Sequence, residues 1–235
     1  MTRTNEHGQP VGDAVDWTPR ERPGPVTLVG RHVRVEPLTQ AHRDGLWAVL
    51  GGPEAAALWT YLAEEPPASA QDLGQVIARR EAAPGAQAFV VCRDGRPLGM
   101  ASLMRIDAVH GSVEVGGIVL GRPLQRTTGS TEAMVLLARH VFDDLGYRRY
   151  EWKCDSLNEP SRRAAVRLGF VAEGRFRNAL VHKGRNRDTD WFSITDADWP
   201  SVSAAYDAWL DEALDPDGRQ RTSLGDLTRR AAAAS

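Results

Sequence analysis

The clearest chemical feature of the sequence is a loop of small and hydroxyl side chains at residues 125–130. Thr127, Thr128, Gly129 and Ser130 stand directly before a segment with helical spacing. The first N–H groups of a helix have no partner within it, and the helix dipole adds about half a positive charge there. Small side chains would let a phosphate approach these groups, so the loop is a candidate anion site. The alternative is an ordinary strand-to-helix turn capped by a Thr or Ser.

The elements on both sides of this loop can be read from their apolar patterns. Residues 113–120 are largely apolar and predict a strand that runs into the loop. After the loop, helical spacing is carried by Met134, Leu137, Val141 and Leu145. Gly146 follows and is expected to end the helix, as a glycine just past a helix end usually does.

Similar patterns predict the remaining elements. Apolar runs indicate strands at 26–38, 88–92, 98–106, 149–154, 170–171, 176–182 and 189–194. Capping residues followed by helical spacing predict helices after Thr39, Ser69 and Asn158. A terminal helix is predicted over 199–214. The three strands between residues 88 and 120 are joined by short turns, so we expect them to form an antiparallel meander.

Composition excludes several classes of protein. Of 235 residues, 42% are hydrophobic and 26% charged, as in a soluble globular protein. The net charge of −2 provides no general attraction to nucleic acid or to an acidic membrane. The sequence contains no run of about 18 apolar residues, so no membrane span is expected. The polar N-terminus does not resemble a signal peptide, so a cytoplasmic location is expected. Cys92 and Cys154 are expected to be reduced core residues, and their spacing predicts no metal site.

The chain is predicted to form one domain with two loose ends. Residues 1–25 are rich in proline and glycine and poor in apolar side chains, so a flexible or loosely draped extension is expected. Residues 26–214 carry all the regular patterns and no internal repeat. Residues 215–235 lack an apolar period, and we expect a disordered tail.

Two motifs carry a resemblance to a known family. Residues 123–133 read Pro-Leu-Gln-Arg-Thr-Thr-Gly-Ser-Thr-Glu-Ala, and residues 158–170 read Asn-Glu-Pro-Ser-Arg-Arg-Ala-Ala-Val-Arg-Leu-Gly-Phe. Together with the order of elements, they resemble the GCN5-related N-acetyltransferase (GNAT) superfamily, most closely its branch of ribosomal-protein N-terminal acetyltransferases. The resemblance covers roughly residues 26–200. It implies an α+β fold with a mostly antiparallel twisted sheet of about seven strands, flanked by helices and splayed between the fourth and fifth strands.

The resemblance also implies acetyl-CoA as co-substrate and no metal. Its pyrophosphate would lie on the loop, and its pantetheine arm along the strand before it and beside the next helix. The implied cofactor contacts are Ile118, Val119, Leu120, Gln125, Arg126, Thr127, Thr128, Gly129, Ser130 and Asn158. Gly116 and Gly117 would suit a bulge at the splay. In the favoured register Gln125 begins the motif and Thr128 replaces the family's first glycine, which requires Thr128 to avoid a positive φ. In the alternative register, aligned on Gly129, Arg126 begins the motif and the helix start shifts by one residue.

Acetyl transfer to an amine needs a positioned carbonyl, a neutral amine and a proton for the leaving thiolate. Glu114, two residues before the glycine pair, is the candidate base; the alternative is a structural strand glutamate. Ser161 matches the family serine that is suspected of donating to the thiol sulfur, although it could be a plain helix-surface residue. The tyrosine of many family members is missing near Ala165. His182 is a second candidate base, with structural packing as its alternative.

The acceptor would be a primary amine, either a protein N-terminus or a small molecule. Trp59, Tyr61 and Trp191 are candidate walls of an acceptor pocket, and core packing is the alternative that we favour for the first two. A basic run over 175–187 could attract an anion but is better explained as a solvated hairpin. A homodimer is compatible with the sequence. Competing hypotheses are a CoA-binding module without turnover, regulatory or scaffolding in role, and a protein-interaction domain that binds no CoA.

Overall fold

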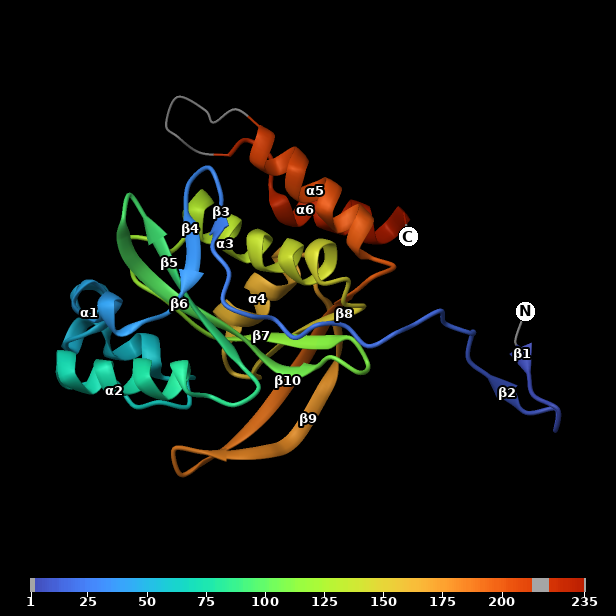
Figure 1. Ribbon diagram of the computed structural model, residues 1–235, viewed down its shortest axis with the longest axis horizontal. Helices are drawn as coiled ribbons and strands as arrows, with labels where there is room; N and C mark the ends of the chain where they lie inside the picture. The colour runs from blue at the N-terminus through green and yellow to red at the C-terminus, as the bar shows by residue number, and fades with distance from the viewer. Residues whose placement is uncertain (1–2, 213–219, 235) are drawn as a thin grey trace.

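A twisted eight-stranded sheet forms the centre of the computed structural model, which describes residues 3–212 and 220–234 (Figure 1). Its strand order is β3-β4-β5-β6-β7-β8-β10-β9, and only the β7–β8 pair is parallel. The strands are β3 (Leu28–Val29), β4 (Arg34–Pro37), β5 (Gln87–Arg93), β6 (Arg96–Asp107), β7 (Ser112–Leu120), β8 (Arg149–Asp155), β9 (Val171–His182) and β10 (Arg185–Thr195). The predicted mixed fold with a mostly antiparallel sheet is confirmed.

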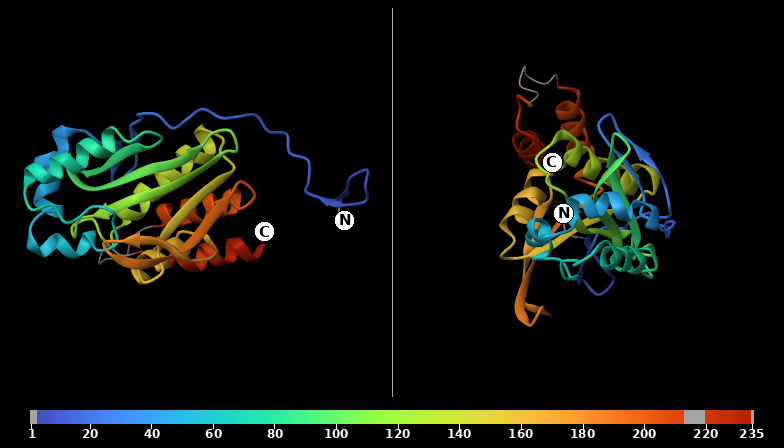
Figure 2. Two further views of the ribbon diagram at one scale, coloured as in Figure 1. Left: turned by 90° about the horizontal axis from the view of Figure 1, so that it is seen from below. Right: turned by 90° about the vertical axis from the view of Figure 1, so that its left-hand side faces the viewer.

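Helices cover both faces of this sheet (Figures 1 and 2). One face carries α1 (Arg43–Leu50), α2 (Ala70–Glu81) and the short 3₁₀ helices η1 (Gln40–His42) and η2 (Pro53–Trp59). The other face carries α3 (Thr128–Arg139), which continues as the π-helical turn η3 (His140–Asp144), together with α4 (Glu159–Arg167), α5 (Trp199–Asp211) and α6 (Leu224–Ala234). The sheet therefore separates two apolar cores.

Strand β5 shows how the sequence divides its side chains between these cores. Phe89 and Val91 point into the core under α3, whereas Ala88, Val90 and Cys92 point into the core under α1 and α2. Successive side chains of a strand alternate between faces, so a strand covered on both sides is apolar throughout. This explains why the run predicted as a buried strand contains no outward-facing polar position.

The sheet opens between β7 and β8. The two strands pair only from Ser112–Arg149 to Val115–Trp152, although β7 continues to Leu120. β8 is paired with β10 along its whole length on its other edge, but beyond Val115 it no longer pairs with β7, which leaves this edge of β7 without a neighbouring strand. The predicted splay is therefore present, and it lies directly before the loop that leads to α3.

The N-terminal extension differs along its length. Residues 3–11 form an exposed two-stranded hairpin, β1 (Arg3–Thr4) and β2 (Pro10–Val11), which lies away from the domain (Figure 2). Residues 17–23 instead lie against it. The Trp17 indole donates to the Val109 carbonyl at 2.7 Å, and the Arg20 guanidinium donates to the Gly146 carbonyl at 3.1 Å. Residues 17–23 are therefore draped over the domain and held there by specific hydrogen bonds rather than by a large apolar surface.

The predicted disordered tail is corrected by helix α6. Leu224 and Thr228 are almost fully buried, and α6 packs against α5 and α4. The Trp209 indole also donates to the Thr222 carbonyl at 3.0 Å. The sequence reading missed this helix because its buried face contains a threonine and few apolar residues. Residues 215–219 and 235 of the predicted tail lie outside the described residues.

Among the described helices, none has the length and apolar character needed to cross a membrane.

Candidate active site

The N-terminus of α3 is built by a threonine cap. The Thr127 hydroxyl accepts from the Ser130 N–H at 3.2 Å and donates to the Leu124 carbonyl at 2.7 Å. The Ser130 hydroxyl donates back to the Thr127 carbonyl at 2.7 Å. The capping alternative is therefore real, but it satisfies only the third N–H group of the helix, so capping and anion binding can coexist.

The remaining amides of the loop are open to a ligand. The Gln125 N–H is used by the Gly121 carbonyl at 3.2 Å. Within the described part of the chain, the N–H groups of residues 126–129 donate no hydrogen bond. The positive φ of the loop, 58°, falls on Arg126, while Thr128 is the first residue of α3. The sequence requirement that Thr128 avoid a positive φ is thus met.

Two residues fix the start of α3 against the sheet. A Cβ at Gly129 would lie 2.8 Å from Cγ1 of Val33, so glycine is needed here for close packing. The buried Glu132 carboxylate accepts from the N–H groups of Arg31, His32 and Val33 at 2.7, 2.7 and 3.0 Å. A carboxylate that accepts several backbone bonds is strongly held. The candidate anion site is therefore anchored to the β3–β4 turn.

The glycine pair lies at a bulge in β7. Met100 pairs with Val119 and Ser102 with Gly116, so β7 has one extra residue between them, and Gly117 has a φ of 59°. This is the irregularity predicted for the glycine pair. Three predicted cofactor contacts lie nearby. Ile118 is half-buried, and Val119 packs in the core under α1 and α2. The Leu120 carbonyl accepts from the side-chain amide of Gln125 at 2.8 Å.

Arg80 of α2 contacts this bulge and was missed by the sequence analysis. Its guanidinium donates to the Gly117 carbonyl at 2.7 Å and to the Glu64 carboxylate at 2.8 Å. Its side chain is only 8% exposed, and its Nη2 atom has no partner among the described residues. The sequence pattern could have indicated that Arg80 is buried, because it continues the helical spacing of Leu73, Val76 and Ile77 on the buried face of α2.

Glu114 lies beside the same bulge in a set of alternating charges. A Cβ at Gly116 would lie 3.0 Å from its Oε1, so the carboxylate covers Gly116. Its Oε2 lies 2.9 Å from Arg105 Nε and 3.2 Å from Lys153 Nζ. Burial raises the pKa of Glu114, against the opposing effect of Lys153 and Arg105. The carboxylate is therefore at the opening of the sheet but is not an isolated base.

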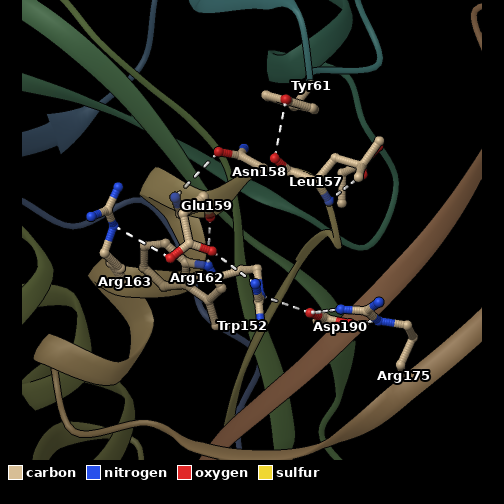
Figure 3. A network of polar contacts seen from close by, with 11 residues as sticks. Tyr61, Trp152, Leu157, Asn158, Glu159, Arg162, Arg163, Arg175 and Asp190 are labelled. Carbon is tan, nitrogen blue, oxygen red and sulfur yellow. Dashed lines mark hydrogen bonds and ion pairs between the residues drawn. The ribbon is translucent and has the colours of Figure 1, made fainter.

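Asn158 is the N-cap of α4 (Figure 3), and Ser161 lies in the first turn of this helix. The Asn158 side chain caps the helix by accepting from the Ser161 N–H at 3.2 Å. The Ser161 hydroxyl accepts from the Trp152 indole at 3.0 Å. Because an indole can only donate, the hydroxyl hydrogen of Ser161 points to another acceptor. This polarity suits a donor to a sulfur.

Comparison with known proteins identifies the family. The sequence model described as "Acetyltransferase (GNAT) domain" matches residues 32–171.

The chain belongs to the GNAT acetyltransferase family.

Solved GNAT structures and a curated relative support this assignment. A GCN5-related N-acetyltransferase from Brucella melitensis is 43% identical, with a TM-score of 0.88 over 91% of this chain and 99% of that one. A GNAT-family structure from Chromobacterium violaceum, titled as a probable acetyltransferase, is 33% identical, with a TM-score of 0.75 over 82% and 99%. The Bacillus subtilis protein named "Putative ribosomal N-acetyltransferase YdaF" is 27% identical over 73% of this chain and 95% of its own length.

The three aromatic residues predicted to line an acceptor pocket differ from one another in their surroundings. Trp59 is fully buried in the core under α1 and α2, and its indole donates to the Leu50 carbonyl at 2.9 Å. It is therefore not a pocket wall in this structure, and its surroundings match core packing, the alternative favoured from the sequence. The Tyr61 hydroxyl donates to the Leu157 carbonyl at 3.2 Å, before α4 (Figure 3). Trp191 is half-buried with Lys153 Nζ 3.6 Å above its ring.

His182 ties the β9–β10 hairpin to the segment after η2. Its Nε2 lies 2.9 Å from the Leu62 carbonyl, so that nitrogen carries the proton and donates. The neighbouring Lys183 donates to the Trp59 carbonyl at 2.9 Å and lies 3.4 Å from Glu65. Nε2 therefore fastens the hairpin, and Nδ1 is the ring nitrogen that is left to accept a proton.

The basic run of the hairpin is largely paired. Asp190 is buried and lies 2.6 Å from Arg175 and 2.9 Å from Arg162 of α4 (Figure 3). Hydrogen bonding from Arg175 is the main cause of its lowered pKa. Asp188 accepts from the Asn178 N–H at 2.8 Å. These contacts support the interpretation of the run as part of the hairpin rather than as a dedicated anion site.

Proposed function

We propose that this acetyltransferase moves the acetyl group of acetyl-CoA to a primary amine by direct attack in a ternary complex, with a protein N-terminus as acceptor. The proposal rests on the position of the unpartnered loop amides relative to the open edge of β7. The unpartnered amides of residues 126–129 stand at the end of the same strand, β7, whose edge is exposed by the splay. A diphosphate on these amides would leave its attached arm beside the open edge of β7.

The residues around the opening supply the remaining chemistry. The acceptor nitrogen forms a bond to the acetyl carbon while the bond from that carbon to sulfur breaks. Glu114 takes the proton of the ammonium through a water molecule, and its raised pKa improves it as a proton acceptor. Ser161 donates its hydroxyl hydrogen to the departing sulfur. Most of the acceleration would come from holding the amine and the carbonyl together.

Arg80 would act on this reaction as a positioning residue. It holds the carbonyl of Gly117 at the bulge and is itself held by Glu64. This contact fixes the backbone where the strand must stay open. We therefore assign Arg80 the role of keeping the bulge in place.

Contacts on the acceptor side favour a chain end over an internal lysine. The segment after η2 is bonded to the loop before α4 through Tyr61 and to the β9–β10 hairpin through His182 and Lys183. A terminal amine is carried by a flexible end that can enter between such bonded segments. The name of the Bacillus subtilis relative, a ribosomal N-acetyltransferase, agrees with this choice.

The test combines binding with an acceptor panel. Calorimetry should show that acetyl-CoA binds, and thiol release should be fastest with short peptides that have a free N-terminus. The same peptides with a blocked N-terminus and one internal lysine are the control. If small amines are the better substrates, the acceptor proposal is wrong while acetyl transfer stands. Binding of acetyl-CoA without thiol release for any amine would support the module without turnover.

Glu114→Gln tests the chemical step. We expect kcat to fall at least about 100-fold, as for loss of a general base, with acetyl-CoA affinity close to that of the parent. An unchanged kcat would mean that proximity alone drives the reaction and that Glu114 is structural.

A further inference from the structure

A second group of reactive side chains lies outside the candidate active site. Glu36 of β4, His42 of η1 and Cys92 of β5 each offer one ligand atom, and these atoms all lie within 4.8 Å of one another. Cys92 is buried, and the other two are half-buried. No other such group of three occurs in residues 3–212 and 220–234. The sequence could not reveal it, since the three residues come from distant parts of the chain.

The distances in this group match those around a tetrahedral metal. Oε1 of Glu36 lies 3.2 Å from Nε2 of His42 and 3.7 Å from Sγ of Cys92. A tetrahedral zinc ion, with bonds of about 2.0–2.1 Å to nitrogen and oxygen and about 2.3 Å to sulfur, separates its ligand atoms by roughly 3.3–3.6 Å. Both distances from Oε1 are close to this range, and the three ligand atoms stay within 4.8 Å of one another, so a metal could lie between them.

The histidine has the surroundings of a metal ligand. Its Nδ1 lies 3.2 Å from the Thr39 carbonyl and 3.2 Å from the Thr39 hydroxyl. Metal-bound histidines usually donate their other ring N–H to such an oxygen, which fixes the ring. Without metal, Nδ1 instead accepts from the Thr39 N–H at 3.1 Å, and Nε2 donates to Glu36. Thr39 can therefore bond to Nδ1 of His42 whether or not this nitrogen carries the proton.

The charges also suit a divalent cation. A thiolate, a carboxylate and a neutral imidazole balance the two charges of zinc, and this mixture of ligands favours zinc over harder cations. Burial, followed by the charge of Glu36, raises the pKa of Cys92 to about 12 without metal. Arg34 lies 3.5 Å from Oε2 of Glu36, whereas the contacts to His42 and Cys92 use Oε1. Oε1 therefore remains for a metal.

We propose that Glu36, His42 and Cys92 bind one Zn²⁺ ion, with water in the fourth position. On binding, the Cys92 thiol releases its proton, and the proton on Nε2 of His42 is exchanged for one on Nδ1, which donates to Thr39. The ion joins β4, β5 and η1, and thereby fixes the segment that leads into α1. The site is structural and contains no residue of the candidate active site.

The experiment uses the full chain with Zn²⁺ and Co²⁺. After reduction, chelation and dialysis, the protein should bind one equivalent of Zn²⁺, and its melting temperature should rise on addition of Zn²⁺ because the ion binds only the folded state. Replacement by Co²⁺ should give the thiolate-to-cobalt absorption of a tetrahedral site. Cys92→Ser and His42→Gln should lose at least about 100-fold in affinity for Zn²⁺, by analogy with the removal of one ligand from a small site.

The chain provides matched controls. Cys154→Ser removes the only other cysteine and should keep the cobalt band. His110→Gln removes a histidine that is paired with Asp107 but has no thiol nearby, and should keep Zn²⁺ affinity. Absence of stoichiometric Zn²⁺ binding by the parent protein overturns the proposal, whatever the variants do. A cobalt band that disappears with Cys154→Ser but survives Cys92→Ser overturns it as well.

Discussion

The first turns of α3 and α4 have the same kind of N-cap but differ in how many backbone N–H groups remain without a partner. Each helix has a polar cap, Thr127 or Asn158, that accepts from the N–H of a serine three residues later. In α4 the other amides are consumed, because the Glu159 N–H bonds to the Leu157 carbonyl and Pro160 has none. In α3 the first two amides stay unpartnered. A helix N-terminus is thus an anion site only where its amides are left over, and α4 instead contributes side chains.

The largest effect should come from removing one leftover amide. Thr128 is the first residue of α3, where proline is tolerated, and Thr127 has the extended backbone that proline requires before it. Thr128→Pro should weaken CoA binding about 10- to 100-fold in calorimetry, the value of one hydrogen bond to a charged group. Ala70→Pro at the same position of α2 is the control and should leave affinity unchanged. Equal affinity in both variants would remove the anion role from α3.

The next effect tests whether α4 acts through a side chain. Ser161→Ala should lower kcat about tenfold, because the departing thiolate loses a hydrogen bond to a developing charge. CoA affinity should stay within twofold, since no α4 amide takes part. A loss seen in affinity rather than in kcat would place Ser161 among the binding residues.

A smaller effect concerns the cap of α4. Asn158→Ala should reduce the free energy of unfolding by about 1 kcal/mol in urea denaturation, a typical value for loss of an N-cap. Asn158→Asp retains a capping oxygen and should restore most of it. If Asp fails to restore stability, the contribution of Asn158 is not capping.

The smallest effect is a pH dependence of the contact that fastens α4 to β10. The pKa of Asp190 is lowered, chiefly by hydrogen bonding from Arg175 and also by Arg162 of α4. A lowered pKa means that this contribution is complete above the usual pKa of aspartate and is lost as the pH falls through the lower, folded-state value. Between neutral pH and pH 3, Asp190→Asn should therefore lose less stability than the parent in thermal melts. An identical acid dependence would show that the Asp190 ion pairs contribute nothing measurable.

Local patterns predicted most of the fold because they report directly on burial. Apolar alternation indicated the strands, and Ser69 and Asn158 are caps in the structure as expected, while Thr127 is the cap that the alternative for the loop required. The bulge at Gly116 and Gly117 was predicted from the resemblance and agrees with the strand register. Helix α6 was missed because its burial depends on partners in α4 and α5 rather than on its own composition.

The candidate site was less accessible to sequence reasoning, because it depends on which polar groups meet in space. Trp59 and His182 have residue types suited to a pocket, yet one is a core residue and the other bonds to the Leu62 carbonyl. Arg80 was overlooked because a cation on an apolar stripe is usually exposed, and only the fold shows that it meets the Gly117 carbonyl. Long-range partners of this kind leave no local pattern.

The hydrogen bonds between Glu132 and the β3–β4 turn would affect the affinity for a cofactor. Three backbone amides hold this carboxylate, so the first turn of α3 is already rigid before any ligand arrives. A preformed site loses little conformational freedom on association, and more of the interaction energy then appears as affinity. In the proposed complex, residues 31–33, nearly a hundred positions upstream in the chain, would thus help to determine how tightly the diphosphate is held.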